Sequence, residues 1–250
     1  FLTKDVNVGY YSASMRISKL SLAIIGVLSA VLLPRLTIAF QNKDLTEAKS
    51  LLSKSMNFVI FLSFPIALGT YCLAEEIITL FAGNGYLPAV GSLQILCFIV
   101  IFVGIAQIFS HQILLPLHQE KKILYASLFG VVISLSLNFI LIPFLKQNGA
   151  AISSLATEVC VTIALFFYAF KILDFKFPVL QVFQSAITCI VFFLIKFLVL
   201  KLTIVPILVI VLTVMLSASF YLCAQLFIWK NKNVLDILSG FGPLKFLQRV

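Results

Sequence analysis

The feature that most constrains this chain is the recurrence of long apolar runs along its length. A helix needs about 20 apolar residues to cross roughly 30 Å of hydrocarbon, and segment 88–117 contains no Asp, Glu, Lys or Arg at all. Only 11% of the 250 residues are charged, whereas 62% are hydrophobic, a balance that water-soluble domains do not show. The chain is therefore predicted to lie in a bilayer.

Seven segments are predicted to cross the membrane, namely 9–34, 56–81, 88–117, 123–145, 150–170, 179–200 and 203–229. They are apolar on every side rather than alternating, which favours helices over barrel strands. The predicted fold class is all-α, a polytopic membrane helix bundle of about seven transmembrane helices. Gly149 is expected to end one helix in a tight antiparallel turn, and residues 41–55 are expected to form a short amphipathic helix in the longest loop.

The basic residues divide unequally between the two sides of this seven-span arrangement. If the chain starts outside, one side receives Arg35, Lys43, Lys49, Lys54, Lys121, Lys122, Lys171, Lys176, Lys230, Lys232, Lys245 and Arg249. The other side receives only Lys4, Lys146 and Lys201. Short cytoplasmic loops are enriched in Lys and Arg, so the C-terminus is predicted to be cytoplasmic. This distribution, rather than nucleic-acid binding, accounts for the net charge of +9.

The sequence offers no recognisable metal, nucleotide or cofactor site. Its five cysteines form no C-x-x-C pair, are odd in number and fall inside predicted spans, so they are interpreted as small apolar residues. The two histidines are not arranged as H-E-x-x-H, and there is no Gly-rich phosphate loop.

Several segments, taken in order and spacing, resemble a known family. They are "VGYYSASMRI", "VLLPRL", "FPIALG", "EEIITLFAGNGYLPA" and "LNFILIPFLKQNGAAISSLATE". Together they are similar to the second half of polysaccharide flippases of the multidrug/oligosaccharidyl-lipid/polysaccharide (MOP) exporter superfamily, over about residues 5–175. These flippases have two six-helix lobes and often two extra C-terminal helices.

The resemblance implies that this chain is the C-terminal lobe of a two-lobe transporter in the bacterial inner membrane. Residues 1–178 would hold the helices of the second lobe, 179–229 two additional helices, and 230–250 a cytoplasmic tail. The first residue is Phe1 rather than Met, so the sequence is expected to be a fragment that lacks the N-terminal lobe. The implied substrate is an undecaprenyl-pyrophosphate-linked oligosaccharide, and the implied partners are membrane lipids, the missing lobe and the polysaccharide polymerase machinery.

Arg16 and Lys19 are the candidate substrate-binding residues. The uncharged run 20–33 has 14 residues, about 21 Å of helix, and is too short to cross the hydrocarbon unaided. One interpretation is that the two cations extend to the headgroups. The other is that their i,i+3 spacing puts them on one face lining an aqueous cavity, where Arg and Lys would bind a pyrophosphate; the resemblance also implies cavity cations from this helix.

Other polar residues inside the spans have less specific interpretations. Glu158 is a candidate for ion coupling or for charge pairing with Arg16 or Lys19. Pro65 and Gly69 form a candidate hinge, with a static kink as the alternative.

Structural roles are expected for the remaining polar groups. Lys196 is expected to extend to the headgroups, and Glu75 and Glu76 to be interfacial. His111 and Asn138 are expected to make hydrogen bonds between helices. The two last spans show no motif and are interpreted as lipid-facing.

Three functions remain open from the sequence. The first is flipping of a lipid-linked oligosaccharide by alternating access. The second is cation-coupled multidrug export, which shares the superfamily fold and for which a more acidic cavity is expected. The third is a membrane-embedded glycan polymerase or transferase, disfavoured because the outer loops are short. A transporter rather than an enzyme is therefore predicted.

Overall fold

The computed structural model describes residues 4–173, 175, 177–203 and 205–229, and the predicted tail 230–250 lies outside them. The described residues are helical throughout, without a strand, which confirms the predicted all-α class. In chain order the elements are α1 (Asp5–Gln41), α2 (Leu45–Cys72), α3 (Ala74–Ala82), η1 (Asn84–Ala89), α4 (Val90–Leu96), α5 (Ile99–Gln107), η2 (Ile108–Leu114), α6 (Glu120–Phe170), α7 (Val179–Leu200), α8 (Pro206–Cys223) and η3 (Ala224–Ile228).

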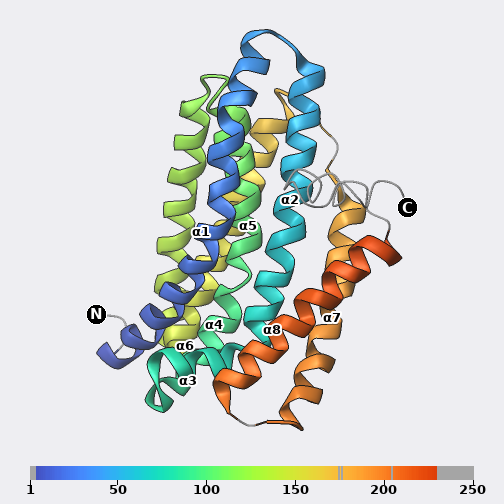
Figure 1. Cartoon of the computed structure of the whole chain (residues 1–250). Helices are drawn as coiled ribbons and strands as arrows, with labels where there is room; N and C mark the ends of the chain where they lie inside the picture. The colour runs from blue at the N-terminus through green and yellow to red at the C-terminus, as the bar shows by residue number, and fades with distance from the viewer. Residues whose placement is uncertain (1–3, 174, 176, 204, 230–250) are drawn as a thin grey trace.

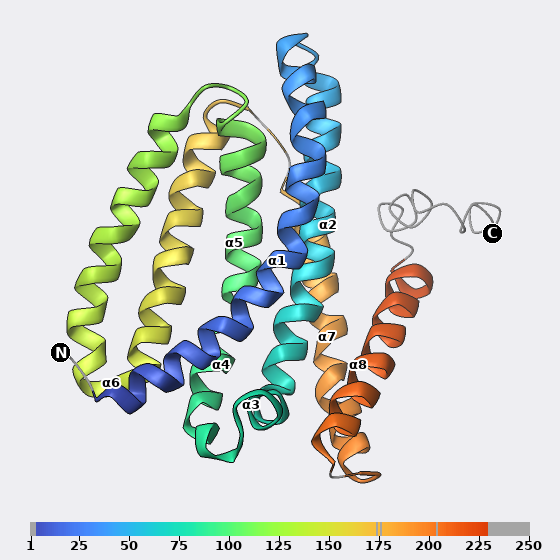
Figure 2. The same cartoon turned by 60° about the vertical axis from the view of Figure 1, so that its left-hand side comes forward.

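Five helical segments among the described residues are long and apolar enough to cross a membrane: Leu45–Cys72, Asn84–Leu114, Glu120–Phe170, Val179–Leu200 and Pro206–Ile228. The third of these, α6, folds back on itself into two antiparallel arms (Figure 2), so it contains two of the predicted spans. Helix α1 adds 37 residues, about 55 Å at 1.5 Å per residue. The result is a polytopic helical membrane protein.

The α6 hairpin turns at Lys146, not at Gly149 as predicted. Lys146 has φ 51° and ψ −127°, whereas the residues on both sides of it are helical. Gly149 instead lies in the second arm, at a point where the first arm comes close: a Cβ there would be 2.5 Å from the carbonyl oxygen of Leu141. The tip of the hairpin is held by Ser92, which donates to Asn148 Oδ1 at 2.8 Å.

Three other boundaries differ from the sequence prediction. The connection between α1 and α2 is only residues 42–44, so the predicted loop helix at 41–55 is the first part of α2. The predicted span 56–81 is broken at Leu73, where α3 begins as a separate helix. The predicted span 88–117 is a chain of shorter helices that ends in the π-helix η2.

The connections between helices gather at the two ends of the bundle, as the alternation of basic and less basic loops predicts. Connections 42–44 and 115–119 and the C-terminal end of α6 lie at one end, and the α6 turn and the C-terminal end of α7 lie at the other (Figures 1 and 2). Among the described residues, the first end carries Arg35, Lys43, Lys49, Lys54, Lys121, Lys122 and Lys171, and the second carries Lys4, Lys146 and Lys201. We call the first the basic end.

The main core lies where α1, α2, α5 and α6 meet. It contains large buried side chains such as Ile25, Ile60 and Phe109. Helix α7 packs along α2 and α8 packs on α7 (Figure 1). Helix α7 carries several buried polar residues, including Gln184, Ser185 and Thr188. Because these side chains are buried within the protein, the last helices are not simply lipid-facing.

Candidate functional site

Arg16 and Lys19 lie on the outward face of α1, because the opposite face of that helix is fixed against the bundle. Ser14 and Ser18 are buried, and Ser14 donates to the carbonyl of Ala89 at 2.9 Å. Both cationic side chains are exposed. In Figure 2 helix α1 crosses diagonally in front of α4 and the lower turns of α6.

Neither cation is neutralised within the described part of the chain. The ion pairs found there are His118 with Glu120 and Lys196 with Glu76. An unpaired cation facing hydrocarbon is costly, by about 3 kcal/mol at the centre of a span on insertion scales. The pair is therefore suited to an aqueous cavity or a headgroup region, and it is free to receive an anion.

Glu158 lies on the second arm of α6, beside α1 but not in contact with its cations. Its backbone carbonyl accepts a hydrogen bond from Thr162 Oγ1 at 2.7 Å, and Thr162 also reaches the Phe102 carbonyl of α5 at 3.1 Å. Helices α1 and α6 meet one turn earlier, where Tyr11 and Ser154 share a 2.8 Å hydrogen bond. The Glu158 side chain is half-buried and forms no ion pair with Arg16 or Lys19.

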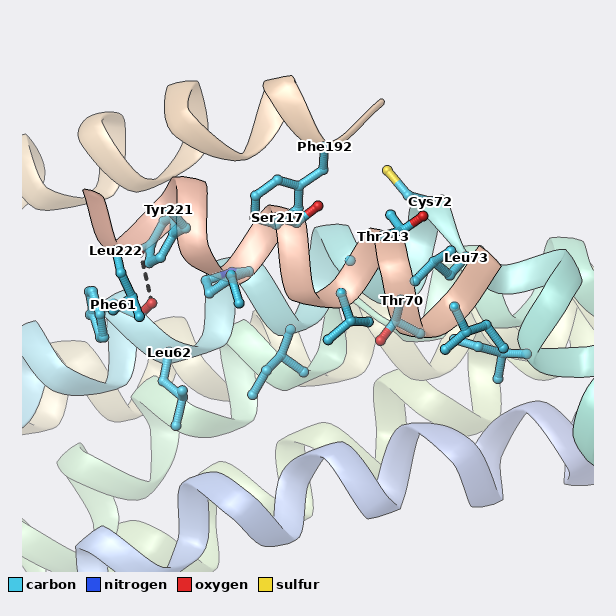
Figure 3. A pocket seen from close by; sticks show the side chains of 17 residues that line it. Phe61, Leu62, Thr70, Cys72, Leu73, Phe192, Thr213, Ser217, Tyr221 and Leu222 are labelled. Atoms are coloured by element: carbon cyan, nitrogen blue, oxygen red, sulfur yellow. Dashed lines mark hydrogen bonds between the residues drawn. The ribbon is translucent and has the colours of Figure 1, made fainter. Parts of the chain in front are cut away.

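Pro65 and Gly69 lie inside α2, which continues through both residues. Both line an apolar groove of about 440 Å³ between α2, α7 and α8 (Figure 3). Tyr221 closes one part of its wall by donating to the Phe61 carbonyl at 2.9 Å. The groove is lined by Phe61, Leu62, Pro65, Ile66, Gly69, Thr70, Cys72, Leu73, Ile77, Phe192, Ile210, Thr213, Val214, Ser217, Ala218, Tyr221 and Leu222.

The last two predicted spans carry no motif that points to this groove. The available signal was the spacing of Thr213, Ser217 and Tyr221, which repeats every four residues and therefore follows one face of a helix. Thr213 and Ser217 are buried, and their hydroxyls have no hydrogen-bond partner among the described residues.

Lys196 does not extend freely outward as predicted, because its ammonium pairs with Glu76, and both side chains are largely buried. Lys196 Nζ lies 2.8 Å from Glu76 Oε1 and donates to the Cys72 carbonyl at 2.7 Å. The ammonium thus joins α7 to the break between α2 and α3. It lies one helical turn from Phe192, at the end of the groove lined by Cys72.

Two predicted interhelical hydrogen bonds are also corrected. His111 is exposed and bonds its neighbour Ser110 at 3.1 Å. Asn138 donates to Ser134 on its own arm at 3.3 Å. The bond that joins the arms is from Ser153 to the Ser134 carbonyl, at 3.2 Å. In the described residues no three His, Cys, Asp or Glu side chains gather as a metal site requires.

The chain belongs to the class of polytopic helical membrane proteins, and its motifs resemble those of flippases of the MOP superfamily. A family model described as "Polysaccharide biosynthesis protein" matches residues 2–91, the segment that includes Arg16, Lys19, Pro65 and Gly69. This match supports the resemblance that the sequence motifs indicated.

Two bacterial relatives and one solved structure agree with that class. The relatives are probable lipid II flippases MurJ, from Rhizobium tropici (26% identical over 144 residues, 55% of this chain) and Rhizobium meliloti strain 1021 (27% over 148 residues, 54%). The matched segment spans only 27% and 26% of their lengths.

The solved structure is a lipid II flippase MurJ in an inward closed conformation. It matches with a TM-score of 0.78 over 90% of this chain and 48% of its own chain, at 16% identity. At that identity the likeness concerns the fold, and it confirms the polytopic helical architecture. The resemblance to flippases of the MOP superfamily is therefore confirmed.

Proposed function

We propose that this chain forms one lobe of a flippase that moves undecaprenyl-pyrophosphate-linked oligosaccharide across the bacterial inner membrane. The observation that carries the proposal is the exposed, unpaired pair Arg16 and Lys19 on the outward face of α1. A guanidinium binds phosphate oxygens in a planar fork, and an ammonium adds a compact charge beside it. Two such groups match the charge of a pyrophosphate.

The apolar groove supports a lipid-linked substrate rather than a free sugar phosphate. Its lining comes almost entirely from apolar side chains of α2, α7 and α8. An isoprenoid chain carries no hydrogen-bonding groups, so it can cover the apolar side chains of this groove without burying unpaired polar groups of its own. The substrate would then present its pyrophosphate to the cations while its chain stays in apolar surroundings.

Transport by alternating access needs a second lobe facing α1, because a site between two lobes can open to each side in turn. No covalent step is required, so the proposed activity is transport and not enzymatic catalysis. Pro65 and Gly69 would allow α2 to bend as the lobes rock. Glu158, half-buried next to the α1 contact, would be the group through which an ion gradient is coupled.

The orientation of the lobe follows from its charges. The basic end would face the cytoplasm, because Lys and Arg are retained on that side of short loops. The α6 turn and connection 201–205 would then face the periplasm, and the C-terminus the cytoplasm.

A direct test removes the two cations from the full-length protein. Arg16→Ala combined with Lys19→Ala should abolish glycan export at unchanged abundance and membrane insertion, whereas Lys121→Ala, at an exposed position in the first turn of α6, should leave export normal. Arg16→Lys should be partly impaired, since a point charge does not replace a bidentate fork. Normal export by the double variant would contradict the proposed substrate site.

A second candidate substrate is lipid II, which the names of the two Rhizobium relatives favour. The two substrates are distinguished by complementation with the full-length protein. Rescue of cells that lack a lipid II flippase favours lipid II, and rescue of surface glycan in cells that lack an oligosaccharide flippase favours the first proposal.

A further inference from the structure

A second cavity lies at the basic end, on the part of α2 that precedes the apolar groove. It encloses about 360 Å³ between the first turns of α2, the π-helix η2 and the connection that follows α6. Its lining is mixed, unlike that of the groove, and comes from Lys49, Ser50, Leu52, Ser53, Met56, Ile108, Ile113 and Phe175.

The α2 wall of this cavity is amphipathic along a single helical face. Lys49, Leu52, Ser53 and Met56 follow the spacing i, i+3, i+4, i+7, which places them in one row. Lys49 and Ser53 are exposed, whereas Leu52 and Met56 are each 3% exposed. The polar side chains thus stand at the mouth and the apolar ones at the base.

The opposite wall is apolar and comes from an irregular element. Ile108 and Ile113 of η2 are 0% and 1% exposed, and Phe175 packs against Phe109 at 5.7 Å between ring centroids. The π-helix widens the turn between these isoleucines, and such insertions occur frequently at functional sites. Its wider turn helps to form the hollow.

The charges around the mouth favour an anion. Lys43 and Lys49 lie at this end of α2, and Lys49 forms no ion pair with a described carboxylate. Asp44, the nearest acid before α2, accepts the Glu47 amide at 2.9 Å as the cap of the helix. Neither Asp44 nor Glu47 lines the cavity.

We propose that this cavity binds the phosphate of an anionic membrane phospholipid. Lys49 Nζ and the hydroxyls of Ser50 and Ser53 would contact the phosphate, and the first methylenes of the lipid would cover Met56 and Ile108. A basic pocket between membrane helices, at the level where polar residues give way to apolar ones, has the composition that anionic headgroups recognise. The site is distinct from Arg16 and Lys19 and does not depend on the flippase proposal.

The chain offers a matched control for the test. Lys54 is also an exposed lysine on α2, but it lies five residues from Lys49, about 140° around the helix, and does not line the cavity. Lys49→Gln and Lys54→Gln therefore remove the same charge from the same helix, and only the first removes it from the cavity.

The experiment uses the full-length protein in nanodiscs with a photoreactive phosphatidylglycerol that carries its diazirine next to the glycerol. Labelled peptides are mapped by mass spectrometry. Label is expected in 49–56 or 108–113, to fall about fivefold in Lys49→Gln, and to persist in Lys54→Gln. Ser53→Leu fills the mouth of the cavity without changing its charge and should reduce the label as well. This variant provides the test if Lys49→Gln is poorly folded.

Two further arms separate the possible ligands. The phosphatidylcholine analogue should label this site several-fold less, and millimolar inorganic phosphate should not compete with phosphatidylglycerol. Equal labelling by both lipids, equal loss in the two lysine variants, or displacement by free phosphate would each overturn the proposal. In the last case the site would bind a soluble phosphate and not a lipid.

Discussion

Lys196 on α7 and Glu76 on α3 form an ion pair of 2.8 Å whose side chains are only 18% and 11% exposed. The same ammonium donates to the carbonyl of Cys72, the last residue of α2. That carbonyl belongs to the set that a helix leaves unpaired at its C-terminus. One side chain therefore joins three helices at the point where the chain turns from α2 into α3.

Removing Lys196 should destabilise the protein strongly. Lys196→Ala leaves a largely buried carboxylate and a helix-end carbonyl without partners, and we expect a loss on the order of 3 kcal/mol. The melting temperature of the purified protein in nanodiscs measures this. Lys121→Ala, at an exposed position, is the control, and an equal effect of both substitutions would argue against the ion pair.

The close approach in the α6 hairpin makes Gly149 sensitive to a single methyl group. In Gly149→Ala the new Cβ would lie 2.5 Å from the Leu141 carbonyl oxygen, so the arms must separate, at a cost of about 1–3 kcal/mol. Gly85→Ala is matched, because a Cβ there meets nothing within 4 Å. Thermal unfolding of both variants should show a clear loss only for the first.

Lys146 adopts φ 51°, a conformation that glycine reaches without steric cost. Lys146→Gly should therefore stabilise the turn, or at least leave it unchanged, with a gain of up to about 1 kcal/mol. The measurement is again the unfolding temperature, compared with Lys146→Ala, which keeps the strain. A marked loss in the glycine variant would indicate that the lysine side chain holds the turn.

Replacing a hydroxyl in the apolar groove tests whether it contributes to stability or contacts the substrate. Thr213→Val removes a buried hydroxyl that has no described partner, so stability should be unchanged or rise by up to about 1 kcal/mol. If transport nonetheless falls in the full-length protein, the hydroxyl contacts the substrate. Transport and unfolding measured on the same preparation separate these outcomes, and a large destabilisation would reveal a hydrogen bond to this hydroxyl.

The predicted orientation is tested by single cysteines in a version whose native cysteines are replaced. Lys121→Cys at the basic end and Lys201→Cys at the other end should react with an impermeant thiol reagent from opposite sides of the membrane. Lys201 is preferable to Asn148, whose side chain accepts the hydrogen bond from Ser92. Labelling of both positions from one side would refute the arrangement.

The sequence by itself determined the solvent and the fold class of the chain, and it predicted the grouping of the helix ends. In lipid, the backbone N–H and C=O groups must form hydrogen bonds within the protein, and continuous apolar runs of spanning length achieve this as helices. The distribution of lysines among the loops predicts which helix ends lie at the same end of the bundle, and Figures 1 and 2 show those helix ends together. The sequence also predicts that Arg16 and Lys19 lie together, because residues at i and i+3 share one face of a single helix.

The tertiary structure alone decided what depends on distant partners. The Lys196 to Glu76 pair joins residues 120 positions apart, so no window of sequence predicts that the lysine turns inward. The apolar groove forms only because α2 packs near α8. The row of hydroxyls on α8 can therefore be assigned to a groove only from that packing. Gly149 was correctly assigned to a hairpin, but its role depends on how closely Leu141 returns, since a backbone contact between two arms is set by packing and not by local preference.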